Sequence, residues 1–225
     1  MNMPLVSVII PVKNGEKYLG SAIESVLKTN YSPLEVIVVD GKSVDRTPEI
    51  IRSFKSVRHI CQEGKGLADA WNLGIKEAQG EMISFVESDD YWAPEKLKLQ
   101  VACLVENPDI QYTISRFKFF LEPGCSVPVG FKKELLVGDQ VGRIPGTLLA
   151  RRTLFDVVGV FNNDLSIAAD VDWFVRAKDK GIKSATIPEV LLYKRVHDSN
   201  LSSNAETNNR ELLSLLRKSI GRGQA

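Results

Sequence analysis

The stretch MISFVESDD at residues 82–90 decides the fold class, because an apolar strand in it runs directly into a group of acids. Two similar apolar stretches precede it, LVSVIIPV at residues 5–12 and LEVIVVD at residues 34–40. Near-continuous apolar runs rich in β-branched residues are typical of strands covered on both faces of a sheet. Each run is followed by a turn and an amphipathic helical segment. The pattern therefore predicts an α/β fold with right-handed crossovers and a mainly parallel, Rossmann-like central sheet flanked by helices.

Polar side chains follow these predicted strands at the point where each strand ends. Asn14 comes after the strand expected at residues 5–12, and Asp40 closes the one expected at residues 34–40. Glu87, Asp89 and Asp90 follow the apolar part of the stretch at residues 82–90. Ligands of open α/β sheets bind outside the carboxyl ends of the strands. We therefore expect a binding site at this edge of the sheet.

The second half of the chain predicts a smaller region attached to the same sheet. No repeat and no long linker divides the sequence, so residues 1–225 are expected to form a single domain. The stretch 123–146 is rich in Gly and Pro and is expected to be a loop over the site. Further elements are expected as strands at 110–115, 117–121, 183–187 and 190–195, and as helices at 152–158 and 170–180.

Composition and charge exclude several classes of protein. The formal charge is +1, from 29 Lys and Arg against 28 Asp and Glu, which gives no general attraction to nucleic acid or to an anionic membrane. No apolar run approaches the roughly 18 residues of a membrane span, and the N-terminus lacks the pattern of a signal peptide. Cys61, Cys103 and Cys125 have no CxxC spacing and are expected to be reduced thiols. We expect a cytoplasmic protein with no nucleic-acid partner and with membrane contact that is at most peripheral.

The acids at residues 87–90 repel one another, so a compensating positive charge is expected beside them. A hard divalent cation, Mg²⁺ or Mn²⁺, held by one or two carboxylates together with a phosphate would supply it. The alternative is structural, since Asp89 and Asp90 shortly precede Pro94 and favour the start of the next helix. The residues alone leave both interpretations open.

Asp40 also allows two interpretations. A carboxylate at the end of a buried strand can accept hydrogen bonds from a nucleobase or a ribose, and it can equally bind the amides of its own turn. The first strand is followed by Lys13-Asn14-Gly15 and not by a GxGxxG pattern, and no GxxxxGK[ST] loop occurs. Nicotinamide-dependent and P-loop nucleotide chemistry therefore lack their main support.

Five motifs in this order together resemble a known family. They are SVIIPVKNG (7–15), EVIVVDGKSVDRT (35–47), EGKGLADAWNLGIKEAQG (63–80), MISFVESDDYW (82–92) and AADVDWFVRA (168–177). Over about residues 5–202 the chain resembles a family 2 glycosyltransferase of the GT-A fold. The resemblance implies metal-assisted transfer of a sugar from a nucleoside diphosphate sugar, usually a UDP sugar, to an acceptor hydroxyl with inversion at the anomeric carbon. It also implies a nucleotide-sugar-binding half (1–115), an acceptor-binding half with a C-terminal helix (116–225), and a role in polysaccharide biosynthesis.

Residue roles follow from the resemblance position by position. Asp170 matches the general base, and Asp90 and His197 match positions at the metal and diphosphate. Without the resemblance, Asp170 is also interpreted as a helix N-cap and His197 as a solvated or loop histidine. The donor-binding positions that the resemblance implies are Pro11, Val12, Asn14, Asp40, Gly66, Asp69 and Asp89.

The chain departs from the family's pattern at three positions. Gly41 replaces the second acid of a frequent Asp-Asp-Gly-Ser motif, Ala169 replaces a frequent Glu, and Glu87 stands where Asp or Asn is common. These departures leave donor preference open. The QxxRW signature of processive synthases is missing, so transfer of a single sugar is expected.

Two other functions were weighed against sugar transfer. One is a nucleotide-sugar binding module that has lost catalysis, and the other is a nucleotidyltransferase, for which a Gly/Arg/Lys-rich loop after the first strand is missing. The acceptor is expected to be a glycan, a lipid-linked or a small molecule. The Leu-, Arg- and Lys-containing segment after Asn208 favours a final helix packed on the domain or on a second copy, or contact with a membrane. The sequence does not indicate an oligomeric state.

Overall fold

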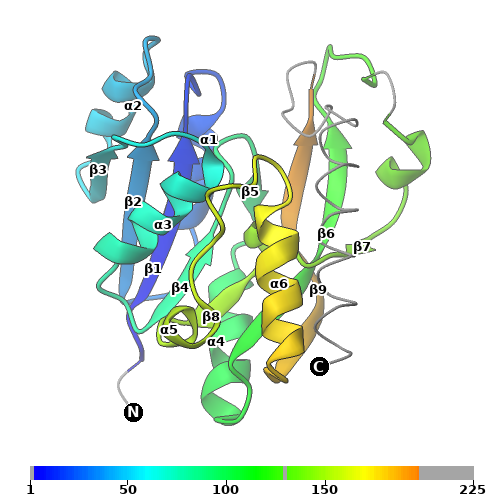
Figure 1. Cartoon of the computed structure of the whole chain (residues 1–225). Helices are drawn as coiled ribbons and strands as arrows, with labels where there is room; N and C mark the ends of the chain where they lie inside the picture. Colours follow the sequence, from blue (N-terminus) through cyan, green and yellow to red (C-terminus); the bar gives the residue numbers. More distant parts are fainter. Residues whose placement is uncertain (1–2, 129–130, 198–225) are drawn as a thin grey trace.

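The computed structural model describes residues 3–128 and 131–197. Within them, one curved sheet runs through the whole molecule and helices cover both of its faces (Figure 1). The strands are β1 (Val6–Val12), β2 (Leu34–Asp40), β3 (Val57–Cys61), β4 (Met82–Phe85), β5 (Tyr91–Trp92), β6 (Tyr112–Leu121), β7 (Gln140–Val141), β8 (Leu149–Arg151) and β9 (Ser184–Val196). The helices are α1 (Leu19–Leu27), α2 (Thr47–Ser53), α3 (Leu67–Glu77), α4 (Lys96–Glu106), α5 (Leu154–Val158) and α6 (Ala169–Asp179), with short 3-10 turns η1 (Lys133–Leu136) and η2 (Pro145–Thr147).

The strand order is β3-β2-β1-β4-β8-β6-β9-β5, and β7 pairs with β6 outside this path. The long ladders, β1 with β2, β1 with β4, β2 with β3 and β6 with β9, are parallel. The antiparallel ladders at β5, β7 and β8 extend over only two or three residue pairs in the described part of the chain. The prediction of a mainly parallel α/β sheet is therefore confirmed.

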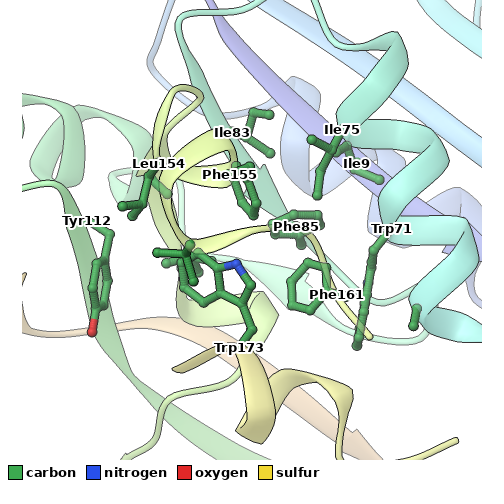
Figure 2. Packing of buried hydrophobic residues seen from close by; sticks show 14 of the residues in the cluster. Ile9, Trp71, Ile75, Ile83, Phe85, Tyr112, Leu154, Phe155, Phe161 and Trp173 are labelled. Atoms are coloured by element: carbon green, nitrogen blue, oxygen red, sulfur yellow. The ribbon is translucent and has the colours of Figure 1, made fainter. Parts of the chain in front are cut away.

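Side-chain alternation along the buried strands divides the core between the two faces. Ile9 and Phe85 face α3, α5 and α6, where Figure 2 shows them packed with Trp71, Phe161 and Trp173. The neighbouring strand positions face α1, α2 and α4 on the other side. Two such layers around one sheet explain why these strands are apolar at nearly every position.

The second half contains longer strands than the sequence predicts. The strands expected on either side of Pro188 form one strand, β9, and those expected on either side of Arg116 form β6. The β6–β9 register shifts at this point, since Ser115 pairs with Ile187 and Arg116 with Val190. A bulge accommodates a proline that cannot donate to the ladder, so the proline does not end the strand.

The expected domain division is compatible with this sheet but is not decided by it. The sheet continues from the first half into the second in the described residues, and the assignment of a donor half and an acceptor half stays a prediction. The expected C-terminal helix lies outside the described residues. Among the helices that are described, none is both long enough and apolar enough to cross a bilayer.

Candidate active site

The predicted site residues gather at one edge of the sheet because parallel strands end together. Val12 pairs with Asp40, so β1 and β2 reach the same edge, and β4 runs parallel to β1 with Phe85 beside Ile9. Glu87 follows β4 directly. The carboxyl ends of three neighbouring strands thus deliver their following residues to one side of the molecule (Figure 1).

The loops after β1 and β2 hold each other in place. The buried residues Pro11 and Val12 complete β1, and Asn14 then adopts a left-handed conformation with φ 54°. Its backbone N–H donates to Ser43 Oγ at 2.8 Å, and its side-chain Oδ1 accepts from the Val44 N–H at 3.0 Å. Asn14 therefore has a clear structural role, and its predicted contact with a nucleotide stays a prediction.

Asp40 is buried, with 3% of its surface exposed. Its Oδ1 accepts from the backbone N–H of Ser43 at 2.9 Å and from Ser43 Oγ at 2.6 Å. Its Oδ2 lies 3.4 Å from His59 Nε2. The structure thus contains the turn that the alternative interpretation describes, with His59 as an added partner. Contact between Asp40 and a nucleobase stays a prediction.

Gly66 and Asp69 are joined by a glutamine that sequence reasoning missed. Gln62 Nε2 donates to the Gly66 carbonyl at 2.9 Å and to Asp69 Oδ2 at 2.8 Å. The backbone N–H of Gln62 donates to the Asp40 carbonyl at 2.8 Å, which links this loop to β2. A Cβ at Gly64 would lie 2.4 Å from Asp69 Oδ2, so the carboxylate packs directly on the loop backbone. The sequence feature that could have indicated a role for Gln62 is its position directly after a strand whose carboxyl end lies at the site.

The acidic group after β4 meets a lysine from β9. Asp90 is 1% exposed, and its Oδ2 lies 2.6 Å from Lys194 Nζ. Its Oδ1 accepts from the backbone N–H of Arg195 at 2.9 Å. Lys194 was not among the predicted site residues, although it stands three residues before His197 in the sequence.

Asp170 belongs to the same electrostatic group as these acids. Burial raises the pKa of Asp170 to about 6, against the opposing effects of backbone hydrogen bonds and of Lys194. Burial likewise raises the pKa of Glu87 to about 8, and the charges of Asp89, Asp90 and Asp170 add to that rise while Lys194 opposes it. The acids that follow β4 and Asp170 of α6 thus act on one another electrostatically, and the charge of Lys194 opposes the rise in pKa of both Glu87 and Asp170.

His197 follows β9 outside any strand and is 7% exposed, so the interpretation as a solvated histidine is wrong while its position in a loop is not contradicted. Its Nε2 lies 3.1 Å from Asp89 Oδ2, and its ring centroid lies 5.0 Å from that of Tyr18. Arg195 stands beside them, with its guanidinium over the Tyr18 ring at 4.5 Å and its Nε donating to the Asp89 carbonyl at 2.8 Å. His197 thus fixes Asp89 in position, and its role as a metal ligand stays a prediction.

The donor atoms of this group suit a hard cation in kind. Mg²⁺ and Mn²⁺ prefer oxygen ligands, and Mg²⁺ is usually held by one or two carboxylates together with substrate phosphates. Asp90 and its neighbours supply such oxygens. No set of three or more His, Cys, Asp or Glu side chains in the described residues forms a complete cage. The kind of oxygen ligand is therefore suitable, and a cation that binds Asp90 together with a phosphate stays a prediction.

A groove of about 550 Å³ is lined mainly by residues 91–95, which directly follow the acidic group in the chain, and by residues of β9. Tyr91 and Tyr193 stack in it, with ring centroids 4.8 Å apart and an angle of 13° between the rings. Leu99, Glu95 and Glu189 also line it. None of the predicted site residues belongs to this lining, so the groove is separate from the acidic group.

Comparison with known proteins identifies the family. A sequence profile described as "Glycosyl transferase family 2" matches residues 7–145, which is more than half of the chain. The chain belongs to glycosyl transferase family 2. The resemblance carried by the five motifs is thereby confirmed at the level of the family, together with the expectation of a glycosyltransferase.

One relative and two solved structures extend this comparison. The chain is 30% identical over 209 residues to the Escherichia coli protein WfaP, a UDP-Glc:alpha-D-GlcNAc-diphosphoundecaprenol beta-1,3-glucosyltransferase, covering 90% of this chain and 81% of WfaP. S. aureus TarS 1–349 in complex with UDP-GlcNAc matches with a TM-score of 0.77 and 24% identity, over 96% of this chain and 66% of that one. The mannosyltransferase PcManGT of Pyrobaculum calidifontis, in complex with GDP-Man and Mn²⁺, matches with a TM-score of 0.74 and 21% identity, over 98% and 65%.

These likenesses confirm the predicted fold class. The two solved chains share the GT-A architecture with this chain. Their sequence identities of 24% and 21% are evidence of a shared fold alone. This chain spans about two thirds of the length of each of them.

Proposed function

We propose that this family 2 glycosyltransferase moves one sugar from a nucleoside diphosphate sugar, with UDP as the nucleotide, to an acceptor hydroxyl with inversion at the anomeric carbon. The observation that carries the proposal is that Asp90 and Asp170, which are far apart in the sequence, both lie close enough to Glu87 for their charges to raise its pKa, while Asp90 Oδ2 lies 2.6 Å from Lys194 Nζ. The donor preference is supported by WfaP, whose name includes UDP-Glc, and by the UDP-GlcNAc complex of TarS.

Asp170 is the proposed general base. A sugar hydroxyl is a weak nucleophile, and a positioned base contributes about 10²–10⁴-fold to the rate of such a step. With a pKa of about 6, the Asp170 carboxylate is ionised at neutral pH and yet is more basic than an exposed aspartate. It takes the proton while the acceptor oxygen bonds to the anomeric carbon and the bond to the diphosphate breaks, with its electron pair leaving on the phosphate oxygen. One base and no covalent nucleophile suffice for inversion in a single displacement.

The leaving diphosphate gains negative charge, which the site must stabilise. Asp90 and His197 are the residues proposed to hold an Mg²⁺ or Mn²⁺ ion, which as a Lewis acid supplies positive charge at the leaving oxygen. PcManGT, which shares the fold, is described in complex with Mn²⁺. Asp89, fixed by His197 at 3.1 Å, would then face the ribose.

The donor nucleotide is proposed to bind along the edge formed by β1, β2 and the loop before α3. The residues proposed for this binding are Pro11, Val12, Asn14, Asp40, Gly66, Asp69 and Asp89. Hydrogen bonds across the loops hold this edge in one shape, through Asn14 with Ser43 and through Gln62 with Asp69. Such prior ordering reduces the entropy that binding must remove.

A lipid-linked acceptor is the one that the comparisons favour among the three classes expected from the sequence. WfaP is named for an acceptor that carries a diphosphoundecaprenol group. Synthesis of a polysaccharide on a lipid carrier, at the cytoplasmic side of a membrane, is the process we propose. The segment expected to contact a membrane lies outside the described residues.

Binding and turnover of the donor test the proposal directly. The melting temperature of the full chain is measured with UDP, GDP, UDP-Glc and UDP-GlcNAc, each with and without Mn²⁺, because a ligand of the native state raises it. We expect the largest rise with a UDP compound, and release of UDP when an acceptor is added. Binding of UDP without turnover on a panel of lipid-linked acceptors would instead favour a binding module, and release of pyrophosphate would favour a nucleotidyltransferase.

A further inference from the structure

Lys194 has an unusual position for a lysine, because its side chain enters the acidic group from the opposite part of the sheet. Its Nζ lies 2.6 Å from Asp90 Oδ2, and 26% of the Lys194 side chain but only 1% of the Asp90 side chain is exposed. The neighbouring backbone N–H of Arg195 binds the other oxygen of the same carboxylate at 2.9 Å. Both oxygens of Asp90 are therefore engaged by β9.

The ammonium of Lys194 interacts electrostatically with several carboxylates at once. The charges of Asp90, Glu87 and Asp89 all stabilise its protonated form, and its own charge acts on Asp170. Short charge-assisted hydrogen bonds in poorly solvated sites are among the strong ones. Lys194 thus already occupies a position at which the family resemblance and the donor chemistry lead us to expect a divalent cation.

We propose that Lys194 is the built-in cation of the donor site and controls when a divalent cation can bind. Without nucleotide, its ammonium holds Asp90 and keeps a divalent ion away. When a nucleoside diphosphate binds, its phosphate oxygens replace Asp90 as the partner of the Lys194 ammonium. The Asp90 carboxylate can then bind the metal. The inference rests on the proposed function for the identity of the anion that draws Lys194 away.

Charge balance gives the physical reason. An ammonium and a divalent cation on the same carboxylate repel each other strongly where solvent is scarce. A diphosphate adds negative charges to the site, so that both cations can be accommodated together. The metal and the nucleotide must then strengthen each other's binding, and the coupling is reciprocal.

The test measures Mn²⁺ binding without any turnover. The concentration of free Mn²⁺ is measured by electron paramagnetic resonance while Mn²⁺ is added to the wild type, Lys194→Met and Lys194→Arg. Each titration is done with and without saturating UDP. For the wild type we expect weak Mn²⁺ binding alone and binding at least about tenfold tighter with UDP. Lys194→Met should bind Mn²⁺ alone at least about tenfold more tightly than the wild type and should lose most of the effect of UDP. Lys194→Arg, which keeps the charge, should resemble the wild type.

A matched control separates this local effect from a general change of charge. Lys118 is an exposed lysine on the neighbouring strand, β6, and Lys118→Met removes the same charge there. We expect it to leave Mn²⁺ binding unchanged. Asp90→Asn should abolish the tight Mn²⁺ binding of every variant, which shows that Asp90 is the ligand concerned.

Two results would overturn the inference. One is equal Mn²⁺ affinity in Lys194→Met and Lys118→Met without UDP, and the other is wild-type affinity for Mn²⁺ that is already tight in the absence of UDP. Since Lys194→Met leaves Asp90 buried beside an apolar side chain, melting is measured first, and Lys194→Gln replaces it if it does not fold. If UDP binds to none of the variants, the proposed function fails, while the titrations without UDP still decide the role of Lys194.

Discussion

Asp170 and Asp172 stand two residues apart in the first turn of α6, but they have different partners. Asp172 Oδ2 accepts from Arg176 Nε at 2.8 Å, and Arg176 also donates to the carbonyls of Val158 and Val160. Asp170 Oδ1 accepts from the backbone N–H of the next residue, Val171, at 2.7 Å, and the charge of Asp170 acts on Glu87. The charge of Asp170 thus acts on the acidic group at the site, whereas Asp172 holds Arg176, which binds the carbonyls of Val158 and Val160 before the helix.

These different partners predict that two equivalent substitutions will have opposite consequences. Asp170→Asn should lower kcat by at least about 100-fold, because a positioned base is lost, with UDP affinity nearly unchanged. Asp172→Asn should lower the melting temperature by several degrees while turnover at low temperature remains, because a buried charged hydrogen bond is lost. UDP release, UDP calorimetry and thermal melting of both variants check this. Undiminished turnover in Asp170→Asn would remove Asp170 as the base.

The pKa of Asp170 predicts the pH dependence of transfer. A base must be deprotonated to act, so activity should be lost as the pH falls through about 6. We expect kcat/KM measured between pH 5 and pH 8 to show a rising limb with an apparent pKa near 6. The residual activity of Asp170→Asn should lack this limb. A wild-type profile that is flat between pH 5 and pH 7 would contradict the assignment.

Glu87 predicts a pH dependence of stability that is independent of catalysis. Burial raises the pKa of Glu87 from its ordinary 4.5 to about 8 in the folded protein, so the folded state binds more protons than the unfolded state between these values. The free energy of unfolding should therefore fall as the pH rises from about 4.5 to 8. Glu87→Gln cannot ionise and should show a smaller fall, as urea unfolding at pH 5 and pH 8 would reveal. Glu134→Gln, an exposed position, is the control and should keep the wild-type slope.

The strands of the first half could be predicted because their sequence pattern is local. Continuous β-branched runs end in Asp40 and before Glu87, and parallel pairing then brings their ends to one edge. Lys194 could not be found in this way. It lies 104 residues from Asp90, and the two meet only because the two-residue strand β5 pairs with β9 beyond its bulge. Pairing over such a distance leaves no periodic signal in the chain.

The burial of a charged side chain could not be predicted from its residue type. Lysine is normally exposed, yet Lys96 is fully buried and donates to Gln100 Oε1 at 2.6 Å. Gln100 in turn donates to the Thr147 carbonyl at 2.9 Å. This hydrogen-bonded network between α4 and η2 compensates for the burial and depends on tertiary contacts that the helical pattern does not contain.

Burial of Lys96 predicts that the protein gains stability as the pH rises. Burial lowers the pKa of Lys96 well below 10.5, so the unfolded state binds its proton more tightly than the folded state does. The free energy of unfolding should rise with pH up to about 10.5, and Lys96→Met should reduce that slope. Lys98→Met, an exposed position on the same helix, should keep it. Urea unfolding between pH 8 and pH 10 measures the slopes, and equal slopes in the two variants would contradict the prediction.

Two helical glycines predict opposite effects of the same substitution. A Cβ at Gly74 in α3 would lie 2.4 Å from Ile9 Cγ2, whereas one at Gly20 in α1 would meet its nearest neighbour, Ile50, at 3.9 Å. Ile9 is fully buried in β1 and has no room to move away. Gly74→Ala should therefore cost about 1–3 kcal/mol by overpacking, while Gly20→Ala should stabilise the helix by up to about 1 kcal/mol. Urea unfolding of both variants at one pH decides between these signs. A stabilised Gly74→Ala would mean that α3 is not held against β1 as closely as the contact with Ile9 requires.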